Sequence, residues 1–383
     1  METKKLYYED PHMQSFSATV TGCREDKEGY WITLDATAFY PEGGGQPCDT
    51  GFLNDTVVTD VREKDGQVLH LCQSAITPGT PVTGKICWER RFDLMQQHSG
   101  EHILSGIVHK RYGYHNVGFH IGKDLVTIDF DGMIPAEALE EIEQEANAIL
   151  WQNLPFRCYY PTKEELPSIP YRRKKDLPWP VRIVEVPGVD LCACCGTQVS
   201  FTGEIGIIKI FSCTKFHQGV RLELACGNRA LTLLTKVYEQ NRLVCQAFSA
   251  KILETGEAAQ RVNQQLAAEK YRSAGLQKQI FANVAQSYAG TKDPVHLETD
   301  LTPGQARELA DAIAAGCEGI ATVLSGTDEA GYSICMVSQT EDVRPAGKAT
   351  METLSGRGGG KADAFQGSCK TTANQIKDYF HLK

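Results

Sequence analysis

The chain lacks several features that would narrow its class at once. It contains no run of about 18 apolar residues, so no transmembrane helix is predicted and we expect no membrane partner. The amino-terminal stretch METKKLYYEDPHM has no apolar segment after its lysines, so we expect no secretory signal. Basic residues are also in deficit, because 39 Lys and Arg against 48 Asp and Glu give a formal charge of −9. The chain is therefore not a generic basic nucleic-acid binder, and any contact with nucleic acid must be local.

Cysteine, by contrast, is abundant. Fourteen cysteines are scattered over 383 residues, and they form one tight group, Cys192, Cys194 and Cys195. So many thiols would pair at random in an oxidising compartment, so we expect a cytoplasmic protein with reduced thiols. The apolar fraction of 42% and the charged fraction of 23% are ordinary for a globular protein. At about 150 residues per domain, the length predicts two or three domains.

Four successive regions of different pattern predict an α+β fold. Residues 1–88 contain short segments rich in Val, Thr, Ile and aromatics at turn-bounded spacing, which is typical of a small β barrel. Residues 89–228 mix helical and strand patterns and predict an α+β core. Residues 229–290 lack proline and favour a helical spacer, either a pair of long helices or one broken helix. Residues 291–383 predict a C-terminal αβ domain in which a glycine-rich loop precedes a closing helix.

The second region begins with a helical pattern over residues 90–112 that carries the motif HSGEH. His98 and His102 are four residues apart, so on a helix they share one face about 6 Å apart along the axis, which suits two imidazoles on one zinc ion. Glu101 falls on another face, so we expect it beside the ligands, or as a solvated charge, rather than as the general base. A pair of ordinary core or surface histidines is the alternative.

The cysteine group lies in DLCACCGTQVS, residues 190–200, which we expect in a turn between two strands. A catalytic zinc takes three protein ligands and keeps one position open, and two histidines with one cysteine make such a set. A structural zinc ribbon is not predicted, because no second CxxC motif is present. Two alternatives remain: small buried thiols, and a Cys–His hydrolase with Cys194 or Cys195 as the nucleophile.

Three blocks, in order, resemble the free-standing alanyl-tRNA editing proteins, which are relatives of the editing and C-terminal parts of alanyl-tRNA synthetase. AFYPEGGGQPCDTG (38–51) resembles the glycine-rich editing motif of that family. HSGEH (98–102) with CCGTQ (194–198) resembles its paired zinc motif. LSGRGGGKADAFQGS (354–368) resembles the glycine-rich loop of its C-terminal domain. Together the blocks span nearly the whole chain, so the resemblance covers the long form of the family.

The resemblance implies a zinc-dependent deacylase that acts in trans on mischarged tRNA(Ala), mainly Ser-tRNA(Ala) and secondarily Gly-tRNA(Ala). A pocket shaped for alanine discriminates weakly against glycine and serine, so a second, hydrolytic sieve is needed. The implied ligands of one Zn²⁺ per chain are His98, His102 and Cys194. Gln198 stands where the family has its final histidine, so Gln198 itself, Cys192, Cys195 or water completes the site. A catalytically weakened tRNA-binding protein of the same fold is the alternative.

The glycine-rich block supplies the expected substrate pocket. Thr37 and Gln46 are expected to hydrogen-bond the seryl hydroxyl, although each also suits a plain strand or turn position. Three consecutive glycines would let the backbone approach the terminal adenosine closely, or form an ordinary turn: Gly43, Gly44 and Gly45.

Two local basic clusters are the expected RNA contacts. YRRKKDLPW (171–179) carries four consecutive cations beside aromatics, which suits backbone contact and end stacking but also a solvated loop: Arg172, Arg173, Lys174 and Lys175. The segment 343–383 has seven Lys or Arg against three Asp or Glu. Its glycine-rich stretch combines cations with backbone N–H groups that suit phosphate: Arg357, Gly358, Gly359, Gly360 and Lys361. The resemblance also implies tRNA-elbow binding and a homodimer through the C-terminal half.

Overall fold

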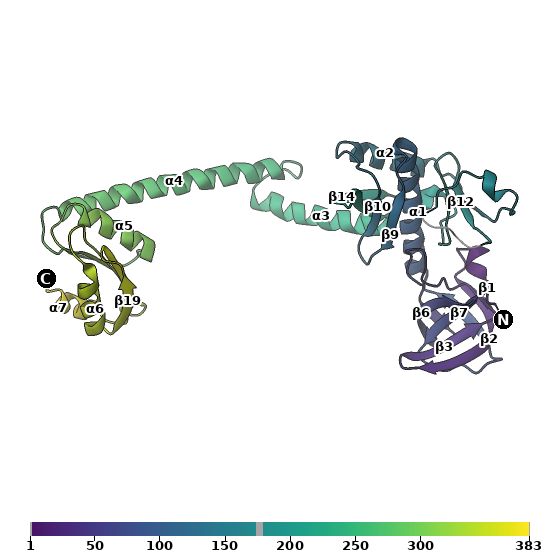
Figure 1. The fold of residues 1–383 in the computed structure, drawn as a ribbon, viewed down its shortest axis with the longest axis horizontal. Helices are drawn as coiled ribbons and strands as arrows, with labels where there is room; N and C mark the ends of the chain where they lie inside the picture. The colour runs from purple at the N-terminus through teal and green to yellow at the C-terminus, as the bar shows by residue number, and fades with distance from the viewer. Residues whose placement is uncertain (1, 174–178, 383) are drawn as a thin grey trace. The chain divides into compact units, whose positions relative to one another are not determined.

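The computed structural model describes residues 2–173 and 179–382, and the chain forms two compact units, 1–243 and 244–383. Each unit combines helices with β-sheets (Figure 1), so the predicted α+β class is confirmed. The boundary between the units falls within helix α3 (Gly227–Ala247). The finer division into four domains stays a prediction.

The first unit begins with six strands that hydrogen-bond in a closed ring, in the order β2-β3-β7-β6-β5-β8. Strand β8 shows why they do so, because exposed and buried residues alternate strictly along it, with the period of two that a half-buried strand requires. A short parallel pair, β1 (Lys4–Lys5) with β4 (Ala36–Thr37), adjoins the ring. The ring strands are β2 (Ser15–Asp26), β3 (Gly29–Leu34), β5 (Gly51–Leu53), β6 (Thr56–Lys64), β7 (Gln67–Cys72) and β8 (Pro81–Ile86).

Helix α1 (Trp88–Tyr112) organises the rest of this unit. It matches the helix predicted over 90–112, and Gly113 ends it in the left-handed conformation that favours glycine. Cations in its last turn complement the helix dipole. Helix α2 (Ala138–Trp151) packs on it. The strands form a four-stranded and a three-stranded sheet: β14 (Ile208–Phe216), β15 (Gly219–Cys226), β10 (Val126–Phe130) and β9 (Asn116–Ile121), then β11 (Arg157–Tyr159), β12 (Ile183–Val186) and β13 (Asp190–Ala193).

Two glycines let α1 lie unusually close to its neighbours. A Cβ atom on Gly100 would lie 2.2 Å from Cys226 Sγ, and one on Gly106 would lie 2.5 Å from the Val189 carbonyl oxygen. The helix therefore packs closely against both β15 and the segment that leads into β13. This close approach brings the histidines of α1 next to the cysteine segment.

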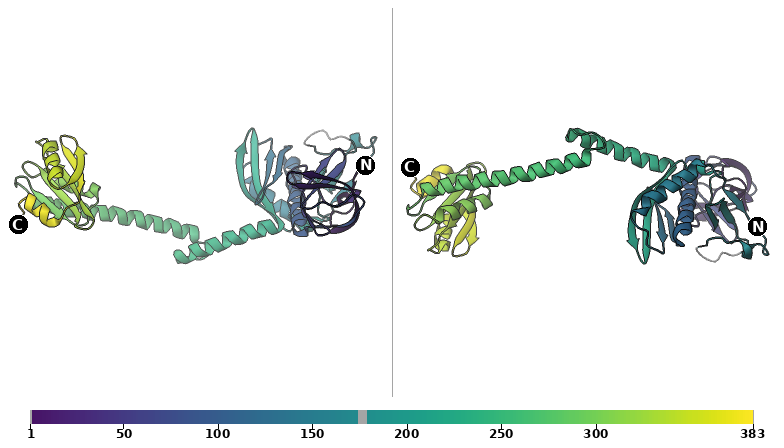
Figure 2. Two further views of the ribbon diagram at one scale, coloured as in Figure 1. Left: turned by 90° about the horizontal axis from the view of Figure 1, so that it is seen from below. Right: turned by 90° about the horizontal axis from the view of Figure 1, so that it is seen from above.

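The second unit holds a five-stranded sheet with helices on both faces (Figure 2). Helix α5 (Pro303–Ala314) and the end of α4 (Thr255–Ser287) cover one face, while α6 (Val343–Thr353) and α7 (Ala373–Tyr379) cover the other. None of the helices in the described ranges is long and apolar enough to cross a membrane. The sheet order is β16 (Val295–Glu298), β17 (Ala321–Thr327), β18 (Gly331–Val337), β20 (Ala364–Cys369) and β19 (Gly356–Gly360).

The glycine-rich segment of this unit corrects a prediction. It was expected to be a loop, but Gly356–Gly360 forms the edge strand β19 and pairs with β20 in antiparallel register. Clustered glycines are a strong turn signal, yet ladder hydrogen bonds use only the backbone, so a glycine run can pair as well. Helix α6, which precedes this strand, was also missed.

A buried ion pair joins α1 to the loops of the β ring. Arg91 is fully buried, and its Nε donates to Asp49 Oδ1 at 3.0 Å. Its two other nitrogens donate to the carbonyl oxygens of Pro11 and Ala38. Tyr40 N donates to the second Asp49 oxygen at 2.6 Å, so the pair is fully hydrogen-bonded. It fixes the start of α1 against the loop that leads to the glycine-rich motif.

We expect Asp49→Asn to destabilise the first unit by about 3–5 kcal/mol, because it leaves the buried Arg91 charge without a counter-charge. Urea unfolding followed by tryptophan fluorescence measures this, since all four tryptophans, Trp31, Trp88, Trp151 and Trp179, lie in that unit. Glu145→Gln is the control, because Glu145 pairs with Arg111 near the surface and its loss should cost about 0–1 kcal/mol. Equal effects of the two substitutions would contradict the assigned role of the buried pair.

Candidate metal centre

Two histidines of α1 and one cysteine converge in the first unit. The His98 and His102 rings are nearly parallel, with centroids 5.5 Å apart, and Cys194 Sγ lies 3.3 Å from His98 Nε2. One ligand atom from each of the three residues lies within 4.8 Å of the others. His102 Nε2 is buried and has no hydrogen-bond partner among the described residues. Imidazole nitrogen and thiolate sulfur are preferred zinc ligands, so this group fits a zinc ion.

Strand alternation decides which cysteine joins the group. Asp190 and Cys192 are the buried positions of β13, and Cys194 continues their side of the chain. Cys195 belongs to the opposite side and is exposed. Because successive side chains of an extended chain point to opposite faces, only the even-numbered thiols turn toward α1. Cys192 groups with His102 and Asp190 rather than with His98.

Hydrogen bonds at Nδ1 orient both rings. Gln46 Oε1 lies 2.8 Å from His98 Nδ1, and Asp190 Oδ2 lies 2.8 Å from His102 Nδ1. Oxygen acceptors at Nδ1 hold the proton there, so Nε2 of each ring is free to bind a metal. Arg172 in turn holds Asp190 with two bonds of 2.7 and 2.8 Å. Asp190 was not predicted from the sequence, although the alternating pattern Asp-x-Cys-x-Cys at 190–194 carries the signal.

The three residues are electrostatically coupled. Burial alone would raise the pKa of the Cys194 thiol, but the adjacent His98 and His102 lower that pKa well below its ordinary value. Burial would lower the pKa of His102, but Cys194 and Asp190 raise it to about 10. Thiolate and imidazolium therefore pair here, and a divalent cation would take the place of the imidazolium proton.

Gln198 does not offer its oxygen to this group, contrary to its predicted place among the ligands. Gln198 Oε1 accepts a 2.7 Å hydrogen bond from Ser99 Oγ, and Gln198 Nε2 donates to Cys194 Sγ at 3.7 Å. Cys195 takes no part, and burial raises the pKa of the Cys192 thiol far above its ordinary value. Among the described residues, the group that holds both histidines therefore consists of His98, His102 and Cys194, and their binding of zinc stays a proposal.

Glu101 is buried beside this group, whereas Thr37 is buried against His70 of strand β7. Glu101 Oε1 accepts from Ser105 Oγ at 2.7 Å, and Glu101 Oε2 lies 4.0 Å from His102 Nε2. The Glu101 carboxylate therefore lies beside His102, and its predicted place beside a metal stays a prediction. Thr37 Oγ1 lies 2.9 Å from His70 Nε2 and accepts from Phe39 N at 3.1 Å. The predicted contact of Thr37 with substrate stays a proposal.

The glycine-rich loop, residues 43–46, lies next to His98. A Cβ on Gly45, whose φ is +86°, would lie 2.5 Å from the Phe119 carbonyl oxygen, and the Phe119 ring is 4.9 Å from that of His98. The three glycines line a hollow of about 440 Å³ with Arg62, Glu63 and His120. Gln46 ends the loop, and its amide is engaged by His98 and Thr197. The predicted contact of Gln46 with substrate stays a prediction.

Comparisons with known proteins agree with this geometry. The family model for class II (A) tRNA synthetases matches residues 3–90, and the model for the second additional domain of threonyl- and alanyl-tRNA synthetases matches residues 181–222. The chain is 28% identical over 384 residues to the alanyl-tRNA editing protein Aarsd1 of Mus musculus, covering 94% of this chain and 93% of that protein.

This chain is therefore similar to an alanyl-tRNA editing protein over nearly its whole length. It is 33% identical over 244 residues to the alanyl-tRNA editing protein AlaX-L of Pyrococcus horikoshii, covering 61% of this chain and 60% of the relative. It is 28% identical over 390 residues to the alanine–tRNA ligase of Ignicoccus hospitalis, covering 98% of this chain and 42% of that enzyme. The segments of this chain that the two family models match contain the glycine loop and Cys194 with Gln198.

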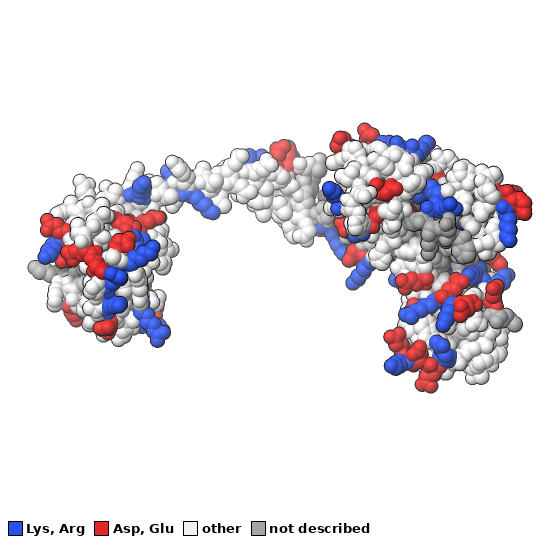
Figure 3. Space-filling model, viewed as in Figure 1, with Lys and Arg blue, Asp and Glu red and all other residues white. Residues whose placement is uncertain are grey.

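The predicted RNA-binding cations of the first unit fall in different surroundings. Arg172 was expected to contact RNA, but its guanidinium is mostly buried and its charge is neutralised by Asp190. Arg173 is exposed, whereas Lys174 and Lys175 lie outside the described residues. On the face seen in Figure 3, cationic and acidic side chains are interspersed over both units. The charge pattern of that face therefore does not single out one RNA-binding surface.

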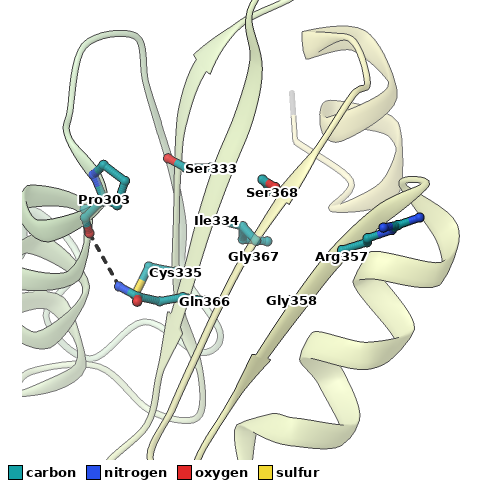
Figure 4. A pocket seen from close by; sticks show the side chains of 10 residues that line it. Pro303, Ser333, Ile334, Cys335, Arg357, Gly358, Gln366, Gly367 and Ser368 are labelled. Carbon is teal, nitrogen blue, oxygen red and sulfur yellow. Dashed lines mark hydrogen bonds between the residues drawn. The ribbon is translucent and has the colours of Figure 1, made fainter.

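The glycine-rich cations of the second unit lie at the edge of its sheet. Arg357 and Lys361 are exposed, and Gly358 lines a hollow of about 300 Å³ together with Gln366 and Ser368. Figure 4 shows the Arg357 side chain extending away from the Pro303 side of this hollow. The contact of this strand with phosphate stays a proposal.

We expect Cys194→Ser to remove bound zinc, whereas Cys195→Ser should keep about one zinc per chain, because only Cys194 faces the two histidines. Elemental analysis after exhaustive dialysis measures both variants. They differ by one position in the sequence, so general effects of removing a thiol are matched. Zinc retained by the first variant and lost from the second would contradict the ligand assignment.

We expect Asp190→Asn to lower zinc affinity about 10–100-fold, since it weakens the hydrogen bond that orients His102. Competition with a chelating dye of known affinity measures the change. Glu185→Gln on the adjacent strand β12 is the control, because Glu185 lies across from Leu191 in the sheet and belongs to neither metal group. Unchanged affinity in the Asp190 variant would refute the orienting role.

Proposed function

We propose that this chain is a trans-acting aminoacyl-tRNA deacylase that hydrolyses the ester of mischarged tRNA(Ala) at a zinc ion. Ser-tRNA(Ala) is the main substrate and Gly-tRNA(Ala) the secondary one. The observation that carries the proposal is the convergence of His98, His102 and Cys194 beside the glycine-rich loop. The family relationship supports the tRNA class, because the relatives are named alanyl-tRNA editing proteins.

The residues of the chain would hold the zinc and fix its surroundings. A bound zinc supplies Lewis acidity toward an ester carbonyl or a water molecule. Gln46 holds the His98 ring, and Asp190 holds that of His102, so neither ligand needs to reorient when substrate arrives. Glu101 places a carboxylate oxygen 4.0 Å from His102 Nε2, where it is suited to accept a hydrogen bond from the attacking water.

Thr37 is the group we assign to the seryl hydroxyl. His70 Nδ1 lies 3.0 Å from the Ile32 carbonyl oxygen and therefore carries its proton there, so His70 Nε2 accepts from the Thr37 hydroxyl. Burial lowers the pKa of His70 to about 4, so the ring stays neutral at physiological pH. The Thr37 hydroxyl is thereby held in one direction, with an oxygen lone pair left for a donor such as serine. Alanine brings no such donor.

The second unit is the part that we assign to tRNA-elbow contact and dimerisation in the cytoplasm. Exposed Arg357 lies in the edge strand β19 and exposed Lys361 directly follows it, and the glycines of the strand leave the backbone open to a phosphate. In the first unit, we assign the exposed Arg173 to contact with the acceptor end of the tRNA. It is a described residue of the predicted basic run.

The test is hydrolysis by the purified full-length chain of Ser-tRNA(Ala) and Ala-tRNA(Ala), prepared on the same transcript and followed by release of labelled amino acid. We expect rapid loss of serine and retention of alanine. Cys194→Ser should abolish the activity, while Cys195→Ser should retain it. Equal hydrolysis of both substrates, or of neither, would contradict the proposal.

A second candidate function follows from the short Cys194–His98 contact. A thiolate of lowered pKa 3.3 Å from an imidazole nitrogen is also the arrangement of a Cys–His hydrolase. Chelators separate the two functions. Activity that survives zinc removal but is lost on alkylation favours the Cys–His hydrolase, whereas activity lost to a chelator and restored by zinc favours the deacylase. Normal tRNA binding without bound metal or hydrolysis would favour the non-catalytic alternative.

A further inference from the structure

A chain of three hydrogen bonds runs from the backbone after Gln198 to the thiolate of Cys194. Val199 N donates to Ser99 Oγ at 3.1 Å, and Ser99 Oγ donates to Gln198 Oε1 at 2.7 Å. Gln198 Nε2 then donates to Cys194 Sγ at 3.7 Å, within the longer range of bonds to sulfur. Ser99 and Gln198 are at most 1% exposed, so solvent does not compete with these bonds.

The amide of Gln198 is fixed in one orientation at both of its ends. Ser99 Oγ accepts a hydrogen bond from Val199 N, so its own O–H is available to donate to the amide oxygen. A thiolate accepts hydrogen bonds and therefore favours the amide N–H, as it favours the N–H of Gly196 at 3.3 Å. Rotating the amide would place its oxygen against the anionic sulfur. An amide nitrogen has no lone pair available to a metal, so Gln198 in this orientation is not a ligand.

We infer that Gln198 is a positioning residue that donates to the Cys194 thiolate and withholds its oxygen, so that the metal keeps one exchangeable coordination position. This inference rests on the proposed function in taking the metal to be zinc. A histidine in this position would supply a third nitrogen as the fourth ligand and match the closed sets of structural zinc sites. The glutamine instead leaves that position to water or an ester carbonyl. Its hydrogen bond draws negative charge from the sulfur and strengthens the Lewis acidity of the metal.

The test uses the full-length chain loaded with cobalt(II), whose visible spectrum reports coordination, and azide as an external ligand. We expect azide to change the spectrum of the natural chain. We expect Gln198→His to abolish this response and to slow metal release to a chelator at least about tenfold, because a fourth protein ligand fills the position. A natural chain whose spectrum ignores azide, or a His variant that still responds to it, would overturn the inference.

A second variant tests the hydrogen bond to sulfur. Gln198→Leu keeps the approximate volume but removes the N–H donor, so the sulfur-to-cobalt charge-transfer band should move to longer wavelength. Gln96→Leu is the matched control, because Gln96 is a buried glutamine of α1 that donates to the Glu204 carbonyl oxygen at 2.8 Å instead. An unchanged band in the Gln198 variant would refute the N–H···S contact.

The outcomes also separate this inference from the proposed function. A chain with the expected cobalt spectra but no deacylation of Ser-tRNA(Ala) would retain the inference and contradict the proposed substrate. A chain that deacylates Ser-tRNA(Ala) but whose cobalt spectrum does not change with azide would support the proposed substrate and contradict the inference. A chain that binds no cobalt would overturn the inference.

Discussion

The candidate centre depends on two hydrogen bonds that fix which nitrogen of each histidine faces Cys194. One comes from Gln46, at the end of the glycine-rich loop, and the other from Asp190, at the start of β13. Without them either ring would be free to present the wrong nitrogen or to turn away. Both acceptors are far from the histidines in sequence, so the centre exists only when three parts of the first unit are assembled. The tight passage of α1 at Gly100 and Gly106 and the buried Arg91–Asp49 pair maintain that assembly.

The histidine pair and its helix were predictable from the sequence, because helical periodicity alone brings residues four apart onto one face. The choice of Cys194 over Cys195 was not, since it requires knowing where β13 begins and which of its sides meets α1. The role of Gln46 was also hidden, because it rests on a contact across 52 residues. In the glycine-rich segment of the second unit the local sequence was misleading. Its composition is typical of turns, yet the segment pairs as the edge strand β19.

Charge and residue type were the least reliable signals, because partners decide what each side chain does. Arg172 belonged to a run of cations expected on RNA, but its guanidinium is committed to Asp190 and supports the metal centre instead. Gln198 departs from the pattern that the resemblance implies, which left a weakened site as the alternative to a retained zinc site. Its bonds to Ser99 and Cys194 give the departure a different meaning, because they leave the three-ligand group intact. Substitution of a ligand is thus compatible with an open catalytic centre.

X-ray absorption at the zinc edge of the purified chain is the most direct test of the proposed three-ligand centre, because it counts ligands by element. A centre of His98, His102 and Cys194 predicts one sulfur at about 2.3 Å, with nitrogen and oxygen neighbours at about 2.0–2.1 Å that include two imidazoles. Two or more sulfurs would place Cys192 or Cys195 on the metal and contradict the three-ligand centre. A zinc without sulfur would contradict the role of Cys194, on which the proposed chemistry rests.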